Sequence, residues 1–175
     1  APEIGWLVID AASESKGDDV MQSLGRALDD VAAKRLGTQL SPASCMTKWL
    51  ASGEAPPGFS IDRDLELQSA EFDKPTIRYV RHALEGREIQ QHIAAGKTAT
   101  RLGMTWQDRI SFVLTDTLQV KRLDFLDIAN NESESQPEDE EEKFENDFVL
   151  MTGELTHMLQ DLIEVLGGAK RDESA

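Results

Sequence analysis

Gly96, Lys97 and Thr98 match the end of a phosphate-binding loop, so nucleotide chemistry is the first possibility to test in this sequence. Such a loop has the form G-x-x-x-x-G-K-[ST], and its early glycine lets successive backbone N–H groups turn inward around phosphate. Here the early position is Gln91, and residues 84–95 are typical of a helix instead of the buried strand that must precede the loop. The sequence therefore argues against an ATPase.

Other residue types that support catalysis or metal binding are present but poorly placed. Asp62 and Asp64 could form an acid pair, yet their polar segment has no positioned histidine, which favours a solvated loop. Cys45 is the only cysteine and has no Cys or His neighbours at zinc spacing, so an internal disulfide is excluded and a reducing cytosolic compartment is expected. The three histidines are far apart in the sequence: His82, His92 and His157. A metal site would form only if the fold happened to bring these distant side chains together.

The 175-residue chain has a net charge of -15, but this charge is unevenly distributed. Residues 1–73 carry a net charge of -7 and residues 123–175 one of -13, whereas residues 74–122 carry +5. If the strands and helix of the basic segment form one layer, their cations converge: Arg78, Arg81, Arg87, Lys97, Arg101, Lys121 and Arg122. This layer would bind a phosphate backbone, or it would be a solvated basic surface; the sequence leaves both open. Sequence-specific readout is disfavoured, because the helix-turn-helix, zinc-finger and RNP patterns are missing.

An acidic loop is expected at about residues 130–143, where Ser, Glu and Asp dominate and apolar residues are too few to offset the entropy of ordering. The loop could serve only solubility, or it could compete with DNA for the basic segment. The acidic surface also permits a second function class, a protein–protein interaction module that does not bind DNA directly.

Hydrophobic periodicity predicts an α+β fold with a mixed, mainly antiparallel sheet, packed helices and a long amphipathic C-terminal helix. Residues 4–11 form a continuous apolar run that is expected to be a buried strand, and residues 15–37 have the spacing of a helix. Residues 41–53 have a proline at the first helical position and a terminal glycine, so they should form a second helix. No apolar run approaches the roughly 18 residues of a membrane span.

The rest of the chain should add strands, a central helix and the C-terminal helix. Strands are expected at 59–61, 65–67 and 76–84, a helix at 87–104, and a β-hairpin at 109–128 with its turn at 115–117. A helix over 87–104 would place Arg87, Lys97 and Arg101 on one face. The final helix, 143–168, carries an apolar seam of Phe148, Met151, Leu155, Met158, Leu162 and Val165. The seam is broad enough to cover a second copy of the chain, unless it only fills the chain's own core.

Five motifs together resemble the C-terminal portion of the RdgC family of bacterial recombination-associated proteins, over nearly the whole chain. They are W-x-x-S-G-x-A-P-x-G-F at 49–59, H-I-x-A-G-K at 92–97, W-Q-x-R-I-x-F-V at 106–113, K-R-L at 121–123 and F-x-x-D-F-x-L-M-T-G-E-L at 144–155. The chain lacks an initiator Met, and family members carry a further N-terminal portion, so we expect a fragment. Residues 1–40 would be a β-α unit that ends the family's central domain. Residues 41–175 would be its base and dimerisation domain.

The resemblance implies a homodimer that closes into a ring around duplex DNA, with single-stranded DNA as a second candidate ligand. The ring would bind without sequence preference and limit access of the RecA recombinase. It implies a cytoplasmic, nucleoid-associated protein with no enzymatic activity, no cofactor and no membrane contact. The DNA-binding residues expected from the basic segment and the resemblance are Arg78, Arg81, His82, Arg87, Lys97, Arg101, Lys121 and Arg122. The dimer interface would lie along the apolar seam of the last helix.

Overall fold

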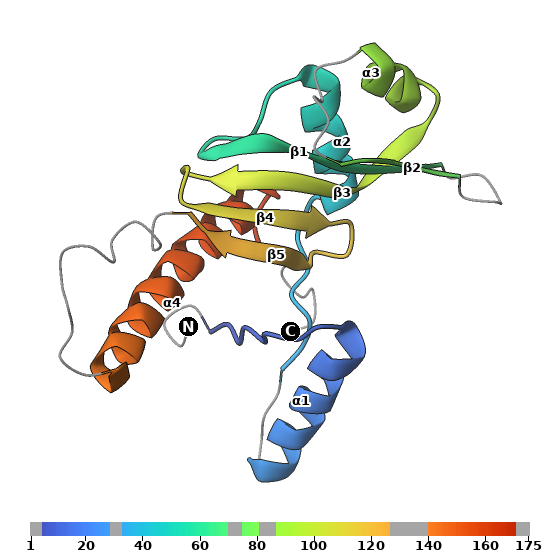
Figure 1. Cartoon of the computed structure of the whole chain (residues 1–175). Helices are drawn as coiled ribbons and strands as arrows, with labels where there is room; N and C mark the ends of the chain where they lie inside the picture. Colours follow the sequence, from blue (N-terminus) through green and yellow to red (C-terminus); the bar gives the residue numbers. More distant parts are fainter. Residues whose placement is uncertain (1–4, 29–32, 70–74, 81–86, 127–139, 171–175) are drawn as a thin grey trace. The chain divides into compact units, whose positions relative to one another are not determined.

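A computed structural model describes residues 5–28, 33–69, 75–80, 87–126 and 140–170 (Figure 1). The chain forms two compact units, residues 1–36 and residues 37–175. None of the helices in the described residues is long and apolar enough to cross a membrane.

In the described part of the first unit the chain forms helix α1 (Glu14–Ala27), and the prediction of a strand before this helix is wrong. The Ser13 side chain accepts a hydrogen bond from the Lys16 backbone N–H and so caps the helix start. Residues 6–11 are irregular, and Leu7 and Val8 are about half exposed. A strand needs a neighbouring strand to satisfy its backbone, and the sheet formed by the described residues does not include this segment.

The helix of the first unit also ends earlier than the predicted end at Gly37. Leu28 is extended and donates its N–H to the Leu24 carbonyl, which terminates α1 after Ala27. None of the helix residues is fully buried, although Met21 and Leu24 are partly buried and Arg35 forms ion pairs with Glu14 and Asp18 of the helix. Residues 29–32 of the predicted helix lie outside the described residues.

The second unit is built on a five-stranded antiparallel sheet in the order β2-β1-β3-β4-β5, whose strands lie side by side in Figure 1. The strands are β1 (Phe59–Ser69), β2 (Thr76–Tyr79), β3 (Lys97–Trp106), β4 (Ile110–Thr115) and β5 (Val120–Phe125). The expected α+β class is confirmed, as is the hairpin of β4 and β5. A mixed, mainly antiparallel sheet was expected, whereas all pairs of the described strands are antiparallel. The two short strands expected at 59–61 and 65–67 are one continuous strand.

The helix predicted over residues 87–104 is wrong in its second half. Helix α3 (Arg87–Ala94) ends at a turn in which Gly96 has φ 85°, and β3 begins at Lys97. Glycine adopts this left-handed conformation without steric cost, so Gly96 ends the helix. β3 then pairs with both β1 and β4, which satisfies its backbone on two sides and outweighs local helix propensity.

Helix α2 (Pro42–Ser52) matches the prediction, since Pro42 is its first residue and Gly53 caps its end with φ 70°. Helix α2 and the last helix, α4 (Glu140–Val165), both contribute to the core that covers the inner face of the sheet. The largest fully buried side chains of this core are Met46, Leu67, Leu102, Met104, Ile110, Leu114, Met158, Leu162 and Leu166.

Helix α4 is held to the sheet by its C-terminal half. The Trp106 indole N–H donates to Asp161 Oδ2 at 2.8 Å, and Arg109 forms an ion pair with Glu154 at 3.0 Å. The helix begins at Glu140, so the last four residues of the predicted acidic loop are helical instead, and residues 130–139 of that loop lie outside the described residues.

The apolar seam of α4 divides into two parts with different surroundings. Met158 and Leu162 are fully buried in this chain's own core, with Leu155 and Val165 packed beside them. Phe148 is 58% exposed and Met151 37% exposed. The buried members are therefore not available to a second chain, whereas the N-terminal part of the seam is.

Candidate nucleic-acid interface

The outward face of the sheet is polar because side chains alternate across each strand. On β1, Leu65 and Leu67 are buried in the core, and Asp64 and Glu66, which alternate with them, point to the other face. Pairing carries this alternation across the sheet, since Leu67 lies opposite Ala99 and both are fully buried.

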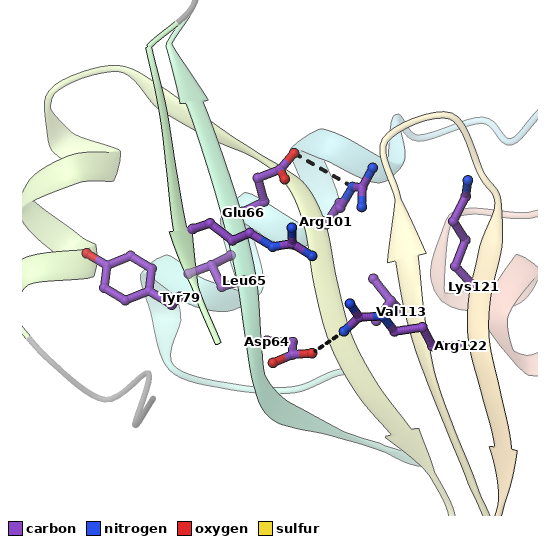
Figure 2. A pocket seen from close by; sticks show the side chains of 9 residues that line it. Asp64, Leu65, Glu66, Tyr79, Arg101, Val113, Lys121 and Arg122 are labelled. Carbon is purple, nitrogen blue, oxygen red and sulfur yellow. Dashed lines mark hydrogen bonds and ion pairs between the residues drawn. The ribbon is translucent and has the colours of Figure 1, made fainter. Parts of the chain in front are cut away.

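An open recess on the outward face gathers cations from three strands (Figure 2). Its lining comes entirely from strands: Asp64, Leu65 and Glu66 of β1, Arg78 and Tyr79 of β2, Arg101 of β3, Val113 of β4, and Lys121 and Arg122 of β5. Four cations and two carboxylates therefore share one recess, which carries a surplus of positive charge in a chain of net charge -15.

Two β-bulges aim cations at this face. Between β1 and β3, Glu66 pairs with Arg101 and Leu67 with Ala99, so Thr100 is an extra residue and lies on the outward face beside Arg101. Between β4 and β5, the register shifts after the Val113–Lys121 pair. Arg122 then has φ 52°, an uncommon conformation for a residue other than glycine.

The second bulge places two successive cations on one face. Regular alternation would direct Lys121 and Arg122 to opposite faces of β5. Instead, Arg122 Nη1 reaches Asp64 Oδ2 at 2.9 Å, on the same face as Lys121. Figure 2 shows the Arg122 side chain extending toward Asp64.

The two carboxylates of the recess are each paired with one arginine. Arg101 Nε lies 3.7 Å from Glu66 Oε1, which also accepts a hydrogen bond from the Thr100 hydroxyl at 2.9 Å. Arg122 pairs with Asp64 as described above. In contrast, neither Arg78 nor Lys121 forms an ion pair with any described residue.

Tyr79 lies at the edge of the recess, opposite Leu65 and near α3. Burial raises the pKa of its hydroxyl, and the nearby Glu88 carboxylate raises that pKa further. The hydroxyl is therefore neutral at physiological pH and adds no negative charge to the recess.

The structure brings together four of the eight cationic or histidine residues predicted from the sequence: Arg78, Arg101, Lys121 and Arg122. Lys97 precedes the bulge and shares its face with buried Ala99, so the strand directs it away from Arg101. Arg87 is exposed at the start of α3, outside the recess. Arg81 and His82 lie outside the described residues.

Two sequence interpretations are settled by the observed elements. Gly96-Lys97-Thr98 joins a helix to a following strand, which reverses the strand–loop–helix order of a nucleotide-binding loop. Asp62 and Asp64 lie in strand β1 and not in the expected solvated loop. Sequence reasoning missed Asp64 and Glu66 as members of the site, although their alternation with Leu65 and Leu67 was a strand signal.

The fold and this recess define an α+β protein with an exposed, cation-rich sheet face. The chain belongs to the RdgC family, because the family profile described as "Putative exonuclease, RdgC" matches residues 1–169. It is 48% identical over 170 residues to the recombination-associated protein RdgC of Cupriavidus pinatubonensis, covering 97% of this chain and 57% of that protein. The proteins of the same name from Cupriavidus necator and Herminiimonas arsenicoxydans are 49% and 47% identical, with 97% and 95% of this chain and 57% and 56% of those proteins covered.

The chain thus spans a little over half the length of the curated relatives that it matches. Their names associate those relatives with recombination, whereas the family description refers to an exonuclease. Within the described residues, no group of three or more His, Cys, Asp or Glu side chains is arranged to hold a metal ion.

Proposed function

We propose that this chain binds duplex DNA without sequence preference through the outward face of its sheet. The observation that carries the proposal is the convergence of Arg78, Arg101, Lys121 and Arg122 in one open recess. Cations of this kind contact phosphates, which fix the position of DNA but carry no base information. The acidic remainder of the chain repels DNA, so binding is directed to this face.

The assembly that we propose is a homodimer that closes a ring around DNA and limits access of the RecA recombinase. Membership of the RdgC family supports a role in recombination. The exposed part of the α4 seam, Phe148 and Met151, continues the stripe that packs into the core at Leu155. Together with Phe144, whose ring stacks on Phe148, it supplies an apolar surface for a second copy. The chain spans 57% of the first of these relatives, so the ring is proposed for a protein of the relatives' full length.

The test is binding of a fluorescent 30-base-pair duplex over a salt series, measured by anisotropy. The slope of log K against log salt is about -0.9 per neutralised phosphate, so the four cations give a slope between about -1.8 and -3.6. The double variant Arg78→Ala/Lys121→Ala should weaken binding to all sequences alike and flatten the slope by about 1.8. Lys48→Ala is the matched control, because Lys48 is an exposed cation of α2, which packs on the inner face.

The proposal is wrong if the parent chain does not bind DNA at low salt, or if Lys48→Ala weakens binding as much as the double variant does. A single strand of the same length, run in parallel, decides the strand preference. End-labelled duplex incubated with Mg²⁺ and resolved on a gel separates binding from the exonuclease activity in the family description. We expect binding without shortening of the DNA.

A second candidate function, an acidic protein–protein interaction module, is favoured by α4 alone. Phe144, Phe148, Val149 and Leu150 are each more than half exposed on a helix that also carries Glu145 and Asp147. Loss of partner binding in Phe148 variants, together with unchanged DNA binding in Arg78→Ala/Lys121→Ala, would favour the module over the DNA-binding surface.

A further inference from the structure

Strand β1 places carboxylates in the middle of the cationic face. In the sheet register Glu66 lies opposite Arg78 of β2 on one side and opposite Arg101 of β3 on the other. One carboxylate therefore stands between two guanidinium groups. Asp64, two residues earlier, receives Arg122 from the far edge of the sheet.

The carboxylates lie deeper than the arginines with which they pair. The side chain of Glu66 is 19% exposed and that of Arg101 43%; for Asp64 and Arg122 the values are 29% and 60%. A phosphate that approaches from solvent is thus more accessible to Arg101 and Arg122 than to the less exposed carboxylates that pair with them.

Gly103 of β3 allows this close placement. A Cβ atom at Gly103 would lie 3.2 Å from the Cβ atoms of both Asp62 and Asp64, and 3.3 Å from the Asp64 carbonyl oxygen. The missing side chain therefore lets the irregular part of β1 lie directly against β3, and Asp64 is held there beside the cations.

We propose that Glu66 and Asp64 are built-in competitors of DNA phosphate, which lower the affinity of the cationic face by sharing Arg101 and Arg122 with it. The inference rests on the proposed DNA binding and adds the residues that set its strength. Each carboxylate offers a guanidinium the same kind of anionic oxygen that a phosphate offers, and it also repels the phosphate. DNA must therefore displace or share two existing ion pairs, whereas Arg78 and Lys121 form no ion pair within the described part of the chain.

The test compares Glu66→Gln and Asp64→Asn with the parent chain in the duplex salt series. Both substitutions keep the shape of the side chain, and Gln retains the oxygen that accepts from the Thr100 hydroxyl. Asp62→Asn is the matched control: it removes the same charge from the same strand, but Asp62 accepts from the Thr105 hydroxyl and pairs with no cation among the described residues.

We expect each variant to bind duplex roughly 2- to 5-fold more tightly at low salt, since an exposed ion pair of this kind is weak. Each should also steepen the salt slope by about 0.9, because one more cation neutralises a phosphate. Asp62→Asn should leave the slope unchanged. The slope distinguishes competition from a general change in net charge.

Three results would overturn the inference. Equal slopes in Glu66→Gln and Asp62→Asn would show that only net charge matters. Weaker binding by Glu66→Gln and Asp64→Asn would show that the carboxylates position the arginines for DNA and do not compete with it. Absence of DNA binding in the parent chain and in all variants would refute the proposed function itself. Binding by the parent with either of the first two results would leave that function standing.

Discussion

The division of the α4 seam predicts that two apolar residues of one helix have separate effects on folding and on assembly. Leu162 is 1% exposed and packs in the core with Met158 and Leu166, so Leu162→Ala removes buried methyl groups and leaves a cavity. Such substitutions cost about 2–5 kcal/mol. Phe148 is 58% exposed, and truncation to Ala should change the free energy of unfolding of the monomer by less than about 0.5 kcal/mol.

The assay is urea unfolding followed by tryptophan fluorescence, combined with sedimentation equilibrium. With a loss of about 3 kcal/mol and an m-value of about 2 kcal/mol/M, Leu162→Ala should lower the unfolding midpoint by roughly 1.5 M. Phe148→Ala should keep the midpoint of the parent at low protein concentration and shift the sedimentation profile toward monomer. Leu150→Ala is the matched control, because Leu150 is 60% exposed but lies about 200° from Phe148 around the helix.

Three results would refute this reasoning. A loss below about 1 kcal/mol for Leu162→Ala would show that the C-terminal half of α4 does not complete the core. A large loss of monomer stability for Phe148→Ala would place Phe148 inside its own chain. Equal association of the parent, Phe148→Ala and Leu150→Ala would show that the exposed seam is not the dimer surface.

Three further predictions concern special backbone and side-chain positions. Gly103→Ala should lower the free energy of unfolding in urea by about 1–3 kcal/mol, because its Cβ would lie 3.2 Å from side chains of β1. Gly153→Ala has open space around it in α4 and should raise that free energy by about 0.5–1 kcal/mol. Arg122→Gly should weaken DNA binding yet change the free energy of unfolding by less than about 1 kcal/mol. Glycine removes the backbone strain at φ 52°, and this gain offsets the lost ion pair and the greater freedom of the unfolded chain. A large loss of stability would contradict this. Burial raises the pKa of the Cys45 thiol, and Lys48 has a smaller opposite effect on that pKa. Iodoacetamide at pH 8 should therefore alkylate the native protein far more slowly than the urea-unfolded protein, as measured by mass spectrometry. Equal rates would contradict the burial of Cys45.

Local signals predicted the elements whose ends are encoded by single residues. Helix α2 begins at Pro42 and ends before Gly53, and both residues favour those positions whatever the surroundings. The β4–β5 hairpin was likewise visible from its alternating apolar residues. In these segments local preference and tertiary structure agree.

The sequence could not show where tertiary pairing overrides local preference. Residues 97–104 continue the helical periodicity of α3, but two neighbouring strands make β3 the centre of the sheet. The opposite failure occurs at residues 6–11, where an apolar run with strand propensity is not part of the sheet that the described residues form. Strand formation depends on neighbours that are distant in the sequence, and periodicity carries no information about them.

The composition of the candidate site depends on bulges, which sequence patterns do not reveal. Under strict alternation, only one of two successive residues such as Lys121 and Arg122 would point to the outward face. Strict alternation would also place Lys97 and Arg101 on the same face of β3. The extra residue at Thr100 separates these two cations, while the bulge at Arg122 joins that residue to Lys121. The same nine basic residues of the middle segment could therefore form a dispersed surface or a focused one. Two inserted residues in the ladders determine that four cations meet in one recess, and they explain why net charge and spacing alone left the function open.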